Sequence, residues 1–205
     1  PEPRTPISPT TTPGDASAYF RITQPGSYYL TGNIRALASK PAIAIDAEDV
    51  TLDLNGFGII GQGQTGFPLT LVLNASNCTV RNGTIHAWGA YVTLNGANNC
   101  VFEDLVIRGP YSGNLEAQAH NSIFRRLVIE SSGEIAIAAT ENSLVEDCVI
   151  LGMGTGLGVG IGVSLNSVVR NCTVKDVGVG ITALGNCLVE SCSVSNATDI
   201  SQFDA

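Results

Sequence analysis

Three side chains that could take part in acid–base chemistry occupy the same position of a repeated phrase in this sequence. His86, Arg108 and Glu130 each lie nine residues after the Asn that begins one copy. An imidazole, a guanidinium and a carboxylate on one surface could move a proton or hold a polar ligand. Trp88 and Tyr111 follow in neighbouring loops, and aromatic rings suit the apolar faces of sugars. We take the first three as candidate catalytic residues and the two aromatics as candidate ligand-binding residues, against the simpler alternative of a polar outer face.

An acidic cluster is the second candidate for chemistry. Asp46, Glu48 and Asp49 lie close together in the chain, and carboxylate oxygens are the ligands that calcium prefers. Calcium is therefore the one cofactor that we consider, bound weakly at this cluster, and the simpler alternative is a solvated turn. Glu103 and Asp104 are also adjacent, but they belong to the series of alternating charges described below.

The composition limits the classes of function. The chain of 205 residues suits one domain, and its 10 basic and 18 acidic residues give a net charge of −8. This balance argues against nucleic acid as a partner, because phosphates require a basic face. No apolar stretch of about 18 residues occurs, so no segment is predicted to cross a membrane. Gly is abundant at 23 residues, and the absence of a helical period favours β-structure.

A nine-residue phrase recurs along most of the chain. Its period of 20 to 24 residues and its short apolar runs, separated by Gly, Asn and Asp, are typical of the coils of a parallel β-solenoid. A degenerate further copy lies within residues 48–60. The six clear copies are NCTVRNGTI (77–85), NCVFEDLVI (99–107), NSIFRRLVI (121–129), NSLVEDCVI (142–150), NSVVRNCTV (166–174) and NCLVESCSV (186–194).

Stacked coils place equivalent residues about 4.8 Å apart, so the repeat predicts rows of side chains. The first position suits a tight left-handed corner and a ladder of side-chain amides: Asn77, Asn99, Asn121, Asn142, Asn166 and Asn186. The fifth position alternates in charge, so neighbours attract and a slip of one coil would place like charges together: Arg81, Glu103, Arg125, Glu146, Arg170 and Glu190. We predict that both rows are structural, with Asp53 extending the second.

The cysteines also fall into rows. Cys78, Cys100 and Cys187 share the second position, whereas Cys148, Cys172 and Cys192 share the seventh. We expect reduced, stacked thiols, because free cysteine behaves as a small buried hydrophobe. Adjacent coils lie within the Cα range of a disulfide, so Cys148–Cys172 and Cys172–Cys192 stay open as alternatives.

The chain divides into four segments. Residues 1–18 are rich in Pro and Thr and are predicted to form a linker or an extended N-terminal segment, and residues 19–40 are predicted to form N-terminal cap strands. Residues 41–196 form the predicted β-helix and residues 197–205 a C-terminal tail. Because this tail is a thin cap, we expect a partner, such as a second copy, or further chain to cover that end.

The phrase GIGVSLNSVVRNCTVKDVGVGI (160–181) resembles the repeats of right-handed parallel β-helix proteins of the pectate-lyase-like superfamily. ITQPGSYYLTGNI (22–34) and AIAIDAEDVTLDLNGFGIIG (42–61) resemble the N-terminal part of β-helix proteins that environmental bacteria export. The resemblance implies an all-β, single-stranded, right-handed parallel β-helix, which we expect to have about seven to eight coils and an N-terminal cap. It also implies polysaccharide as the ligand class and a secreted, periplasmic or cell-surface location.

Three functions remain open on this basis. The first is an exported, rigid structural or glycan-contacting module without catalysis. It is favoured because most coils lack long insertions at their turns and because most charged side chains belong to the alternating row. The second is a polysaccharide lyase or glycoside hydrolase acting on an acidic polysaccharide, centred on His86, Arg108 and Glu130. The third is an oligomeric, tailspike-like assembly module that uses its C-terminal end.

Overall fold

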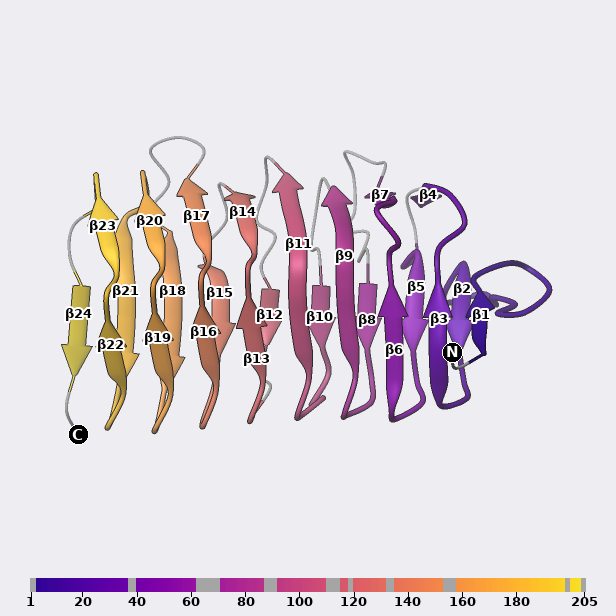
Figure 1. Cartoon of the computed structure of the whole chain (residues 1–205), viewed down its shortest axis with the longest axis horizontal. Helices are drawn as coiled ribbons and strands as arrows, with labels where there is room; N and C mark the ends of the chain where they lie inside the picture. Colours follow the sequence, from indigo (N-terminus) through magenta and orange to yellow (C-terminus); the bar gives the residue numbers. More distant parts are fainter. Residues whose placement is uncertain are drawn as a thin grey trace.

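The computed structural model describes residues 3–36, 40–61, 71–86, 92–109, 115–117, 120–131, 135–152, 158–197 and 200–203. The described residues form an all-β parallel solenoid of about seven turns and contain no α-helix. The coils stack side by side along the long axis, from the N-terminus to the C-terminus (Figure 1). This arrangement confirms the parallel β-helix that the repeat predicts.

The larger, 15-stranded sheet contains two strands from most coils. Nine strands form its main path, in the spatial order β1 (Arg4–Pro6), β3 (Gly26–Tyr29), β6 (Val50–Asp53), β9 (Thr79–His86), β11 (Val101–Gly109), β13 (Ile123–Arg125), β16 (Leu144–Glu146), β19 (Val168–Arg170) and β22 (Leu188–Glu190). The others extend it: β4 (Ile34–Ala36), β7 (Gly58–Gly61), β14 (Val128–Ser131), β17 (Val149–Gly152), β20 (Thr173–Lys175) and β23 (Ser193–Ser195).

The second sheet has nine strands and lies on the other side of the core (Figure 1). Its strands, in spatial order, are β2 (Phe20–Ile22), β5 (Ile43–Ile45), β8 (Leu71–Leu73), β10 (Val92–Leu94), β12 (Leu115–Ala117), β15 (Ile135–Ala139), β18 (Val159–Ser164), β21 (Val179–Leu184) and β24 (Ile200–Phe203). Every pairing between named strands is parallel and in register, which fixes which side chains become neighbours.

The Asn row turns a tight corner between the two sheets. Five of its six members have a positive φ, between 54° and 58°. Asn99 Nδ2 donates a hydrogen bond to Asn77 Oδ1 over 3.0 Å, so part of the row forms the predicted amide ladder. In the last copy Gly185, rather than Asn186, takes the left-handed conformation, with φ of 66°. Glycine enters that region without steric cost, so the corner shifts by one residue there.

A second left-handed row, which the sequence pattern did not reveal, separates the two strands of each coil in the large sheet. Its members include two residue types that rarely adopt this conformation, because Arg126 has φ of 52° and Ser191 has φ of 53°. The row also contains short polar residues that favour it: Asn82, Asp104, Asp147 and Asn171. This second corner gives each coil its bend within the sheet.

The alternating charges form the predicted row, with each arginine in register with the carboxylate of the preceding coil. Glu103 and Asp53 are buried, so the ladder lies partly under the surface. Arg126 also donates to Glu103 over 3.1 Å. The ion pairs along the row are Arg81–Asp53 (3.5 Å), Arg125–Glu103 (2.6 Å) and Arg170–Glu146 (2.6 Å).

Apolar rows fill the interior, and Phe102 stacks on Phe124 with ring centroids 5.4 Å apart. The second position of the phrase holds buried serines that tie coils together, since the Ser122 and Ser167 hydroxyls accept hydrogen bonds from backbone N–H groups of the preceding coil. All six cysteines are free, as the stacked-thiol interpretation expects.

Residues 3–18 pack against the first coil as part of the N-terminal cap. Strand β1 pairs with β3, and Ile7, Thr12 and Ala18 are buried. Arg4 anchors the segment, because its guanidinium lies over the Tyr29 ring and pairs with Asp53 at 3.1 Å. This Pro- and Thr-rich segment therefore forms a strand followed by a turn.

Candidate functional site

His86, Arg108 and Glu130 lie side by side on three successive coils, as the repeat predicts. The register pairs His86 with Arg108 on β9 and β11, and pairs Arg108 with Glu130 on β11 and β14. The Arg108 Nε donates to Glu130 Oε2 over 3.0 Å. The Arg108 side chain is half exposed and the Glu130 side chain is 30 % exposed, so the pair faces solvent. We call these three residues the polar row.

The polar row is short, because its neighbours in register are apolar. Ile60 on β7 precedes His86, and Leu151 on β17 follows Glu130. A cation returns only one coil later, at Lys175 on β20. The candidate site is therefore confined to the coils that carry β9, β11 and β14. Trp88 and Tyr111, the aromatic residues predicted to accompany it, lie outside the described residues.

The two carboxylates on β11, the strand that carries Arg108, are engaged in ion pairs. Glu103 accepts from Arg125 and Arg126, and Asp104 accepts from Arg126 over 2.7 Å. The hydrogen bond from Arg126 holds the pKa of the Asp104 carboxyl below its ordinary value. A general acid at neutral pH needs the opposite shift. Both carboxylates thus pair stacked coils, and Asp104 is poorly suited to donate a proton at neutral pH.

The acidic cluster at residues 46–49 has a structural role. The Asp46 carboxylate forms an ion pair with Arg21 and accepts a hydrogen bond from Asn74 Nδ2 over 2.5 Å. Asp49 turns a corner, with φ of 57°. Among the described residues, no three His, Cys, Asp or Glu side chains come together in a way that could hold a metal ion. The structure therefore does not bring Asp46, Glu48 and Asp49 together as a calcium site.

Two of the stacked thiols, Cys78 and Cys148, are poorly suited to nucleophilic chemistry, whereas hydrogen bonds with these two sulfurs lower the pKa of the Cys100 and Cys172 thiols. The neighbouring Cys100 sulfur and burial raise the pKa of the Cys78 thiol, and Cys172 and burial do the same for Cys148. Because the thiolate is the nucleophile, a raised pKa lowers reactivity. We interpret both cysteine rows as packing elements.

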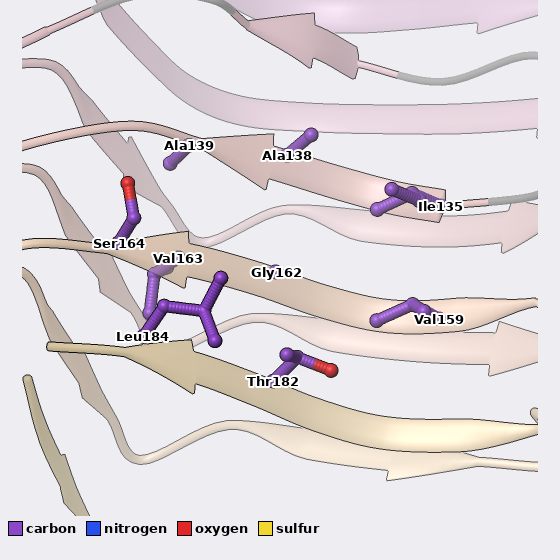
Figure 2. Close-up of a pocket in the computed structure, with 9 residues that line it drawn as sticks. All are labelled: Ile135, Ala138, Ala139, Val159, Gly162, Val163, Ser164, Thr182 and Leu184. Atoms are coloured by element: carbon purple, nitrogen blue, oxygen red, sulfur yellow. The ribbon is translucent and has the colours of Figure 1, made fainter. Parts of the chain in front are cut away.

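One surface feature was missed by the sequence analysis. A shallow apolar hollow lies on the outer face of the small sheet, over β15, β18 and β21 (Figure 2). Its floor includes Gly162, which is half-buried in the middle of β18, whereas the next coil carries Thr182 at the same position. The sequence offered one signal for it, a glycine inside an expected strand, which can mark a place where the surface of the sheet is open.

Comparison with known proteins agrees with the architecture. A family model described as "Right handed beta helix region" matches residues 69–201, which is more than half of the chain. No curated protein matches the chain significantly. Across the described residues, no helix is long and apolar enough to cross a membrane. The matched region contains every clear copy of the repeat and the whole polar row, and on this evidence the chain belongs to the right-handed β-helix family.

Proposed function

We propose that this β-helix is a rigid, non-catalytic module that binds a glycan through the polar row. The observation that carries the proposal is the ion pair of 3.0 Å between Arg108 and Glu130 on adjacent coils, with His86 next in register. The proposal includes the export that the resemblance of the repeats implies. Activity, ligand and location are all parts of this proposal.

The polar row offers hydrogen-bonding groups that match sugar hydroxyls. Arg108 donates through its guanidinium, Glu130 accepts, and the imidazole of His86 can do both. Each residue is held by a parallel strand, so the three groups are fixed at the coil spacing of about 4.8 Å. A ligand that meets such a fixed set loses little free energy to ordering of the protein. An extended glycan lying along the coils fits this linear arrangement.

The same geometry favours binding over catalysis. Arg108 and Glu130 are bound to each other, and the nearby Glu103 and Asp104 are bound to Arg125 and Arg126. A hydrolase requires two carboxyl groups facing one cleft, about 5–10 Å apart, with one of them able to donate a proton. The polar row contains a single carboxylate. It therefore provides recognition groups without this pair of carboxylates.

A polysaccharide lyase or hydrolase is the second candidate. It is favoured by His86, whose imidazole is the side chain best suited to proton transfer near neutral pH and which lies in register beside Arg108. In that case Arg108 would bind the acid group of the substrate. This candidate predicts turnover, whereas the binding module predicts none.

The test is a panel of neutral and acidic polysaccharides, measured for binding and for turnover with the same protein. Binding is followed by calorimetry, and turnover by reducing ends and by the absorbance of unsaturated products. The variants are Arg108→Ala and Glu130→Gln. The matched control is Lys175→Ala. This variant removes an exposed cation that lies in register with the polar row, two coils beyond Glu130.

The proposed function predicts saturable binding to at least one glycan, without products. Arg108→Ala should weaken this binding by about tenfold or more, as expected for loss of a charged hydrogen bond of about 1.5–3 kcal/mol. Lys175→Ala should bind like the wild type. Turnover that Arg108→Ala abolishes would support the enzyme instead, and equal binding by all variants would refute the site.

A further inference from the structure

The three cysteines at the seventh position of the phrase form a row inside the solenoid. Cys148, Cys172 and Cys192 lie on successive coils, and the last two coils are in register, since Thr173 pairs with Ser193. The Ser193 N–H donates to the Cys172 carbonyl oxygen over 2.8 Å, so the backbones of Cys172 and Cys192 are direct neighbours. Neighbouring positions on parallel strands lie about 4.8 Å apart, which is within the Cα range that a disulfide requires.

Cys192 differs from the other cysteines, because it is half-buried whereas they are buried. Its coil is also more loosely covered than the preceding one. Val189 and Val194 are partly buried, whereas Val169 and Val174 on the preceding coil are fully buried. Among the described residues, β22 and β23 pair only with strands of that preceding coil. A small oxidant can therefore reach the Cys192 sulfur, and this coil can shift slightly because it is held on one side.

The Cys172 thiol is the better nucleophile of the two. Hydrogen bonding with the Cys148 sulfur lowers the pKa of Cys172, whereas burial raises the pKa of Cys192. Cys172 is 1 % exposed, so an oxidant in solution does not reach it directly. An accessible thiol beside a buried thiol of lowered pKa is typical of two-cysteine redox sites, in which the first sulfur meets the oxidant and the second resolves the mixed disulfide.

We propose that Cys172 and Cys192 form an oxidation site, at which a small-molecule disulfide such as oxidised glutathione links the two coils. The Cys192 thiolate attacks one sulfur of the oxidant, forms a mixed disulfide and releases one glutathione thiol. The Cys172 thiolate then attacks the Cys192 sulfur, which forms the protein disulfide and releases the second glutathione thiol. The two protein thiols lose two electrons and two protons, and the oxidant takes up both.

The protein disulfide is strained and therefore reversible. Cβ atoms in register on parallel strands stand about 4.8 Å apart, whereas a disulfide requires about 3.5–4.5 Å. The two coils must approach each other slightly, and a strained disulfide is easier to reduce. The cross-link thus forms and breaks with the redox state of the surroundings. It lies in the interior of the solenoid and does not depend on the proposed binding of a glycan.

The other neighbouring thiols have no accessible member. Cys78 and Cys100 are both buried, and Cys148 is buried beside Cys172. An oxidant cannot reach these sulfurs while the coils stay folded. The oxidation should therefore be confined to Cys172 and Cys192.

The experiment incubates the whole folded chain, purified with reduced thiols, in a series of mixtures of reduced and oxidised glutathione. Samples are quenched with acid, alkylated and mapped by mass spectrometry, which identifies each disulfide and any bound glutathione. The variants are Cys192→Ser and Cys172→Ala. The matched control is Cys187→Ser on the same coil as Cys192, because the neighbour of Cys187 in the preceding coil is Ser167. Circular dichroism establishes that each variant is folded.

We expect the wild type to lose two of its six free thiols to a Cys172–Cys192 disulfide that dithiothreitol reverses. Cys187→Ser should form the same disulfide, and Cys192→Ser should form none. Cys172→Ala should instead retain glutathione on Cys192, because the resolving thiol is missing. A wild type that keeps all its thiols across the series, or that stops at bound glutathione, would overturn the proposal. A disulfide of another pair, or one between two chains, would overturn it too.

Discussion

Glu103 is one of the two buried carboxylates of the charge ladder, with Asp53. It is 8 % exposed, and its Oε2 accepts from Arg125 over 2.6 Å and from Arg126 over 3.1 Å. The adjacent Asp104 pairs with the same Arg126, but its side chain is 48 % exposed. The two neighbouring carboxylates thus share Arg126, but Glu103 is more buried and has Arg125 as a second partner, so we compare the two to measure the ladder.

Glu103→Gln should lower the free energy of unfolding by about 1–3 kcal/mol, because it leaves two guanidinium groups short of a charged acceptor near the surface. Asp104→Asn should cost at most about 1 kcal/mol, as is usual for exposed ion pairs. Urea unfolding followed by circular dichroism measures both. Equal effects would show that burial does not decide the strength of the ladder.

The lowered pKa of Asp104 predicts a pH dependence. Because the folded-state pKa lies below the ordinary value of 3.8, the stability that Asp104 adds is complete above that value and is lost as pH falls through the folded value. The difference in unfolding free energy between the wild type and Asp104→Asn should therefore stay constant above about pH 5 and shrink as pH falls below 3.8. Urea unfolding at these pH values tests this, and a difference that grows towards low pH would contradict it.

Strand β18 shows how an element separates structural glycines from a surface one. A Cβ at Gly160 would come within 2.4 Å of Val174 Cγ1 and 2.6 Å of the Gly180 carbonyl oxygen, so the interior requires glycine there. Two residues further on, Gly162 faces outward with room for a side chain. The surroundings of the two glycines therefore give them opposite roles.

Gly160→Ala should destabilise the protein by about 1–3 kcal/mol through overpacking. Gly162→Ala should be neutral or stabilising by up to about 1 kcal/mol, since alanine is less costly than glycine within a strand. Thermal unfolding of the two variants, which differ only in position along β18, provides the comparison. Similar losses in both would mean that Gly162 is needed for folding as Gly160 is.

At the scale of the molecule, the repeat predicted the coil and its rows because in-register stacking makes sequence position equivalent to position in space. His86, Arg108 and Glu130 became neighbours for this reason. The hollow at Gly162 was not predicted, because it depends on which faces of the strands remain uncovered. The order of residues 3–18 also depends on distant contacts, such as Arg4 with Asp53, which no local composition reveals.

The central claim is that the polar row binds a glycan without cleaving it. The most direct measurement is calorimetric titration of the best ligand of the panel, followed by determination of the chain length of the recovered glycan. We predict saturable binding that Arg108→Ala weakens by about tenfold or more, with the recovered glycan at full length. A shortened glycan with the wild type and an intact one with Arg108→Ala would contradict the claim and establish the row as an active site.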